Sequence, residues 1–191
     1  MGKTLKALTK GQMPRTLDDL DNLRAKLYSW KKIEKIKKKA SPAVFHVFVG
    51  GELIEAWQDG EALEDWEEGG WSYIFEYYSD LIPYISDSLN ALGLHDAKEA
   101  FNGIFALIPG IASFDAADLG DAVDFLKDPE YEGYNVSLQN YSAEERARIS
   151  KAFQEMLSRL DRLVEREWEE DSPGEGWTGL LRYIERSYHS E

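Results

Sequence analysis

Hydrophobic side chains recur every three or four positions along most of the chain, which is the spacing of one face of an α-helix. The clearest stripe begins after Ser142, where Ser142 and Glu145 have the spacing of a capping box. The stripe consists of Ile149, Phe153, Met156, Leu157, Leu160, Leu163, Val164 and Trp168. The sequence therefore predicts a long amphipathic helix in this part of the chain.

A second stripe begins at Thr16, which stands three residues before Asp19 in a helix start signal. Its apolar members are Leu17, Leu20, Leu23, Leu27, Trp30, Ile33 and Ile36. We predict one basic helix over residues 16–39, whose last turns carry Lys31, Lys32, Lys35, Lys37, Lys38 and Lys39. Residues 1–15 lack such a pattern and are expected to form a flexible N-terminal arm.

Local propensity is divided in residues 44–56. Ser41-Pro42 is typical of a helix start, but Val44 to Val49 is rich in strand formers and Gly50-Gly51 is unfavourable inside a helix. We favour a helix to about Trp57, with a small hairpin around the two glycines as the alternative. An acidic connection is expected to follow, from Gln58 to Gly70.

The remaining segments also have helical spacing. We expect a short aromatic helix, largely buried, over residues 71–78, and further helices over 81–92, 94–108, 113–126 and 179–188, with a loop over 128–141. Gly93 and Pro109-Gly110 are the stop signals, and Ser113 is the expected cap of its helix. The predicted fold is all-α, a compact single domain over residues 16–191 with seven to eight helices.

Composition narrows the class of protein. A chain of 191 residues with 43% hydrophobic residues can build one core. It contains no cysteine, which excludes disulfides, thiolate metal sites and a cysteine nucleophile and agrees with a reducing compartment. No apolar run suits a signal peptide or a membrane span, so we expect a cytoplasmic protein without membrane contact.

Charge is distributed unevenly along the chain. Residues 1–40 hold 12 basic and 4 acidic side chains, whereas residues 41–191 hold 10 basic and 32 acidic ones. The chain is therefore basic at its start and carries a formal balance of −22 beyond residue 40. Such a field attracts basic partners and repels nucleic acid, so direct binding of nucleic acid is not expected. We expect the lysines of residues 31–39 to pair with acidic side chains, within the chain or across a dimer.

No arrangement of residues indicates catalysis. The three histidines, His46, His95 and His189, stand apart without metal-ligand spacing. Residues 174–179 match a dinucleotide-binding glycine pattern in letters, but a charged helix end precedes them where an apolar strand should stand. We therefore expect a protein that is not an enzyme and has no catalytic residues, no cofactor and no metal.

Four aspartates recur every third residue, at Asp115, Asp118, Asp121 and Asp124. On a helix this spacing spreads the carboxylates over a broad stripe. A calcium loop is disfavoured because Ala117 and Leu119 occupy ligand positions. The four aspartates are expected either to form a solvated helix face or to bind a row of basic side chains on a partner.

Three segments form a recognisable pattern: Glu-Glu-Gly-Gly-Trp at 67–71 with the aromatic residues after it, residues 88–94, and Ala100 to Pro109-Gly110. Through them, residues 45–188 loosely resemble the bacterial DNA-mimic protein family. This chain has Glu68 where the family has Asn, and Tyr73 where it has Gln. The resemblance implies an all-helical, dimeric protein whose carboxylates imitate DNA phosphates and thereby occupy a DNA-binding protein.

The hypothesis favoured by these observations is an acidic module that binds a basic, nucleic-acid-binding protein as a DNA mimic. The candidate contacts are Glu61, Glu64, Asp65, Glu67, Glu68, Asp115, Asp118, Asp121 and Asp124. One alternative is an immunity protein that neutralises a toxic effector, and a weaker one is an enzyme of unfamiliar type. The expected partners are a basic DNA-binding or toxin protein, with a homodimer as a further arrangement.

Overall fold

The computed structural model describes residues 2–62, 69–111, 114–133, 135, 138–172 and 174–190. Regular structure in these residues is helical, with ten α-helices and no named strand, so the predicted count of seven to eight is low. The elements are α1 (Leu5–Leu8), α2 (Leu17–Tyr28), α3 (Ile33–Lys39), α4 (Pro42–Ala62), α5 (Gly69–Tyr77), η1 (Ser79–Leu81), α6 (Ile82–Leu92), α7 (His95–Phe105), α8 (Ala116–Lys127), η3 (Leu138–Asn140), α9 (Ala143–Trp168) and α10 (Thr178–Ser190).

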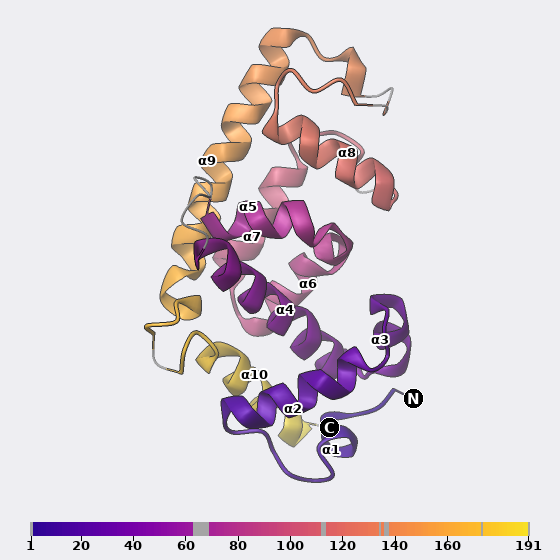
Figure 1. Cartoon of the computed structure of the whole chain (residues 1–191), viewed down its shortest axis with the longest axis vertical. Helices are drawn as coiled ribbons and strands as arrows, with labels where there is room; N and C mark the ends of the chain where they lie inside the picture. The colour runs from indigo at the N-terminus through magenta and orange to yellow at the C-terminus, as the bar shows by residue number, and fades with distance from the viewer. Residues whose placement is uncertain are drawn as a thin grey trace.

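The helices pack around α4. Figure 1 shows α9 running along the long axis of the molecule, with α4, α5, α6 and α7 beside it. Helix α8 lies at one end, and α1, α2 and α10 gather toward the other, near both chain termini. The chain start and the aspartate row of α8 are therefore well separated in space.

Helix α4 is buried on nearly all sides, and the hairpin alternative for residues 44–56 is wrong. A Cβ on Gly50 would lie 3.0 Å from Leu92 of α6 and 3.2 Å from Leu180 of α10, so the missing side chain lets three helices approach closely. Strand formers occur here because the helix is central and needs apolar residues all round. Burial has overridden local β propensity.

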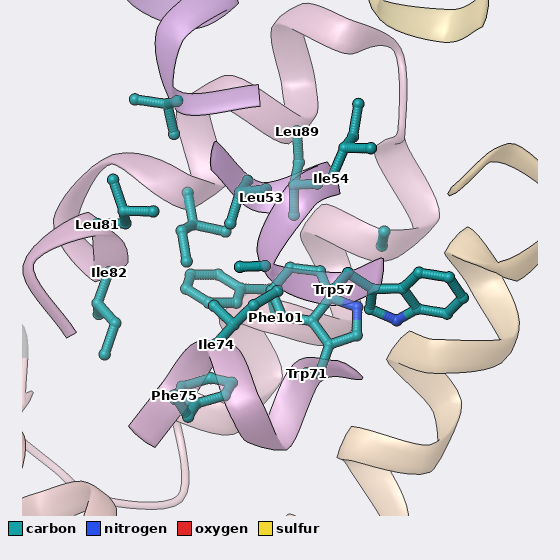
Figure 2. Close-up of a cluster of buried hydrophobic side chains, with 14 of the residues drawn as sticks. Leu53, Ile54, Trp57, Trp71, Ile74, Phe75, Leu81, Ile82, Leu89 and Phe101 are labelled. Atoms are coloured by element: carbon teal, nitrogen blue, oxygen red, sulfur yellow. The ribbon is translucent and has the colours of Figure 1, made fainter. Parts of the chain in front are cut away.

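Helices α4 and α5 meet with their backbones almost in contact. A Cβ on Gly70 would lie 2.3 Å from the Trp57 ring, and one on Gly60 would lie 2.8 Å from the Gly70 Cα. Figure 2 shows the core that this contact brings together, with Trp57 and Leu53 of α4 close to Trp71 of α5. The predicted aromatic helix is confirmed as largely buried, although Tyr77 is 56% exposed.

The prediction of a single helix over residues 16–39 is wrong, because this segment forms two helices. Its capping box at Thr16 is present, but α2 ends at Tyr28, and α3 starts at Ile33 after a turn in which Lys31 has φ of +68°. In a continuous helix, the nine residues from Leu27 to Ile36 would place these two side chains about 180° apart. The turn reorients α3, so that both side chains are buried.

Residues 2–15 are docked and do not form the flexible arm that was expected for residues 1–15. Lys3 forms a β-bridge with Ala40, and Leu5 of α1 is fully buried. The Lys6 ammonium lies 5.5 Å from the centre of the Tyr188 ring of α10. The N-terminal segment thus closes the end of the helical packing.

The other predicted elements are present with shifted ends. Helix α4 continues through Ala62 into the expected acidic connection, of which residues 63–68 lie outside the described part. Helix α7 ends at Phe105 instead of Ile108. Helix α8 is capped by Asp115, and the expected cap Ser113 is outside the described residues. The capping box at Ser142 and the long helix behind it are confirmed.

Candidate functional site: an acidic groove at two helix ends

A groove of about 330 Å³ lies between the end of α4 and the link from α9 to α10. Four exposed carboxylate side chains line it, and they are Glu61, Glu169, Glu170 and Asp171. Its other walls are Trp57, Gln58 and Ala62, so no lysine or arginine of the described chain lines it. The groove is therefore a concave region of concentrated negative charge.

Two hydrogen bonds from one side chain hold the link against α4. Gln58 Nε2 donates to the carbonyl oxygen of Trp168 at 2.7 Å and to that of Glu175 at 2.9 Å. The rings of Trp57 and Trp168 also meet edge to face, with centroids 6.3 Å apart. The carboxylates of the link therefore lie on a backbone segment whose two ends are both hydrogen-bonded to Gln58.

The helix ends add to the negative charge. Helix α4 ends at Ala62 and α9 ends at Trp168, and both of these ends border the groove. A helix C-terminus carries a partial negative charge because its last carbonyl groups are not paired within the helix. Ammonium and guanidinium groups are the ions that such a site attracts.

A carboxylate that the sequence analysis missed lies behind the groove. Asp161 Oδ1 accepts hydrogen bonds from Trp57 Nε1 at 2.9 Å and from the Trp71 backbone N–H at 3.1 Å. Burial raises the pKa of Asp161 to about 6, and the negative charges of Glu61 and Glu165 act in the same direction. Asp161 stands four positions after Leu157, so helical spacing already places Asp161 on the apolar face of α9.

Glu61 has a structural role as well. Its Oε1 accepts a hydrogen bond from the Gly70 backbone N–H at 2.7 Å, while Asp161 accepts one from the next residue. Two carboxylates thereby cap the start of α5, where the helix dipole favours negative charge. Of the candidate contacts, Glu61 lies in the groove, and Glu64, Asp65, Glu67 and Glu68 lie outside the described residues.

The four aspartates of α8 do not form one solvated row. Asp115 accepts hydrogen bonds from two backbone N–H groups as the cap of α8, and Asp118 accepts one from Asn135 Nδ2 at 3.1 Å. Asp121 is only 2% exposed, and it accepts from the Tyr131 hydroxyl and the Asn135 backbone N–H, both at 2.8 Å. Asp124 is exposed as a residue, but its carboxyl group is partly shielded from water, and this desolvation raises its pKa.

Asp121 therefore holds the following loop to α8 and has no surface to offer a partner. Its selection as a contact residue needs correction, because regular spacing in the sequence does not reveal which aspartate a loop will cover. The remaining aspartates of α8 lie at one end of the molecule, apart from the groove (Figure 1). The structure thus separates Glu61 from the aspartate row.

The lysines of residues 31–39 make no ion pair with a carboxylate of the described chain. Lys37 instead lies 4.4 Å from the centre of the Tyr84 ring, and Lys39 lies 5.6 Å from that of Trp30. The buried cation of this region is Arg24, which pairs with Glu52 at 3.3 Å and with Glu55. The expected pairing of the lysines with the acidic body is not seen among the residues that the structure covers.

No group of histidine and acidic side chains in the described ranges is arranged to hold a metal ion. His46 is half-buried, with Nδ1 3.0 Å from the Ser88 hydroxyl, and burial lowers its pKa. No helix in the same ranges combines the length and the apolar character needed to cross a membrane.

Comparisons with protein-family models, curated proteins and solved structures found no significant match to this chain. The resemblance to the DNA-mimic family therefore stays an expectation from the motifs.

Proposed function

We propose that the protein is an acidic binding module whose groove receives basic side chains of a nucleic-acid-binding protein. The observation that carries this proposal is the convergence of four exposed carboxylates on two helix C-termini, with no lysine or arginine among the residues that line the groove. Surface carboxylates are commonly offset by neighbouring cations, but here the charge is left available to a partner.

DNA mimicry is the form of this function that the charge distribution supports. Residues 41–191 carry a formal balance of −22, and DNA presents one charge for about every 1.7 Å of its axis. A protein that binds phosphates through lysine and arginine can bind carboxylates with the same side chains. The groove would then supply the closest contacts, and the exposed acidic residues around it would attract the partner over longer distances.

The test is affinity capture from a bacterial lysate at low salt, with a groove variant and a charge-matched control. The groove variant is Glu169→Gln, Glu170→Gln and Asp171→Asn. The control, Glu99→Gln, Glu132→Gln and Glu185→Gln, removes the same charge at exposed positions away from the groove. We expect basic DNA-binding proteins on the wild type and the control, and at least about tenfold less on the groove variant.

Two further measurements separate mimicry from other acidic binding. A short DNA duplex should displace the captured proteins, and raising the salt from about 50 to about 200 mM should weaken capture by at least about tenfold. Capture that survives the salt step and the duplex contradicts the proposal. A single captured toxin, insensitive to DNA, would instead identify an immunity protein.

A further inference from the structure

The turn between α2 and α3 builds a second cleft, of about 310 Å³, on a different face of α4. Aromatic residues from three elements line it, with Tyr28 from α2, Phe48 from α4 and Tyr77 at the end of α5, and Tyr78 follows directly. Lys31 and Lys32 line it from the turn itself. Its volume is within the range of small-molecule sites.

The aromatic side chains of this cleft are unusually accessible. Tyr28 is 45% exposed and Tyr77 is 56% exposed, and no other large hydrophobic side chain of the described residues is as accessible. The Tyr28 ring is positioned by Phe48, with centroids 6.0 Å apart, and by the Arg24 guanidinium 5.7 Å away. The Tyr77 ring packs against Tyr73, with centroids 4.7 Å apart, so both rings are held by neighbours. Both also line the same hollow, and their exposed parts offer aromatic surface against which a ligand ring can pack.

Of the two lysines in the lining, Lys31 has a strained backbone conformation. Lys31 has φ of +68°, a conformation that residues other than glycine adopt rarely. Neither Lys31 nor Lys32 forms an ion pair with a carboxylate in the part of the chain that is described. Both lysines are exposed, and they line the same cleft as the exposed rings.

Two carboxylates share the lining of the cleft with the lysines. Glu52 accepts a hydrogen bond from the Tyr28 hydroxyl and shares the Arg24 guanidinium with Glu55, so its carboxylate is held against the cleft wall by partners within the chain. Asp80, from η1, is the other carboxylate in the lining. Its oxygens can accept hydrogen bonds from an amino group on the edge of a ring.

We propose that this cleft binds a nucleoside monophosphate. The base stacks on Tyr28 and Tyr77, and the phosphate dianion is neutralised by Lys31 and Lys32. Adjacent lysines suit a dianion better than a single carboxylate, and a base gains affinity by stacking on an aromatic side chain. The inference is independent of the acidic groove, which is lined by the C-terminal end of α4, whereas the cleft is lined by Phe48 and Glu52 from the middle of that helix.

Calorimetric titration of the full chain tests this site with AMP, GMP, CMP and UMP as probes at low salt. We expect one-to-one binding of at least one of them with Kd below about 1 mM. Adenosine, which has no phosphate, and inorganic phosphate, which has no ring, should each bind at least about tenfold more weakly than the best nucleotide.

Three variants locate the binding. Lys31→Gly removes the ammonium group and suits the positive φ, so the fold should be retained while affinity falls at least about tenfold. Tyr77→Leu should lower affinity to a similar extent by removing a stacking surface. Lys38→Gln removes a lysine that does not line the cleft, and it should change affinity by less than about threefold at constant ionic strength.

Two results would overturn the inference. One is the absence of saturable binding of all four nucleotides at about 5 mM. The other is binding that Lys31→Gly and Tyr77→Leu leave unchanged, which would place it elsewhere on the protein.

Discussion

Replacing the buried carboxylate of Asp161 should change the pH dependence of stability in a way that depends on the substituent. The folded-state pKa of Asp161 is about 6, against 3.8 for an exposed aspartate. Between these values the folded protein holds a proton that the unfolded chain releases. The stabilisation from this proton is fully present below about pH 4 and is lost as the pH rises through about 6.

The size of this effect follows from the two pKa values. A difference of about 2 pH units corresponds to at most about 3 kcal/mol of stability lost between pH 4 and pH 8. Asp161→Asn keeps an oxygen to accept from Trp57 Nε1 and the Trp71 N–H, and it has no charge to bury. We expect this variant to lose the Asp161 contribution to the pH slope and to be at least as stable as the wild type at pH 8.

Asp161→Ala should behave differently, because it leaves two buried donors without an acceptor. Each unsatisfied donor costs about 1–3 kcal/mol, so we expect this variant to be less stable than Asp161→Asn by about 2–6 kcal/mol at pH 8. Urea unfolding followed by tryptophan fluorescence, at pH 5 and pH 8, measures both differences. An Asn variant that keeps the wild-type pH slope, or an Ala variant as stable as Asn, would refute the reasoning.

Four further substitutions test helix packing, the anchoring of the loop after α8 and the turn at Lys31. Gly70→Ala places a Cβ 2.6 Å from the Trp57 carbonyl oxygen and should cost about 3 kcal/mol in urea unfolding, whereas Gly120→Ala, with no atom within 4 Å, should stabilise α8 by about 1 kcal/mol. Asp121→Ala should destabilise by about 2–4 kcal/mol and speed amide hydrogen exchange in the loop after α8, and unchanged exchange would argue against its anchoring role. Lys31→Gly should raise the thermal midpoint by relieving the positive φ, with stability greater by about 1 kcal/mol, and a lower midpoint would show that the lysine side chain stabilises the turn.

Much of the secondary structure could be predicted because its signals are local. The capping boxes at Thr16 and Ser142 involve residues three positions apart, and the structure places helix starts at both. The stop at Gly93 is equally local, since its φ of +87° closes α6. The fold class follows from these signals and from the apolar stripes between them.

The candidate site was predicted less well. Glu61 was selected for its place in an acidic stretch, and it does line the groove. Glu169, Glu170 and Asp171 were treated only as the end of a helix, although they supply most of the groove's charge. The residues next to a carboxylate in the sequence do not reveal that the end of another helix will lie beside it in the folded protein.

The amino-acid sequence alone determined the helices with local start signals, their apolar faces and the contrast between a basic start and an acidic body, because caps, periodicity and charge depend on near neighbours or on composition. Only the tertiary structure decided that the chain turns at Lys31, that Asp121 and Asp161 are covered, and that two helix ends share one groove. These outcomes depend on which surfaces meet, and contacts between residues far apart in the chain outweigh local preference wherever they bury more apolar surface or satisfy more polar groups.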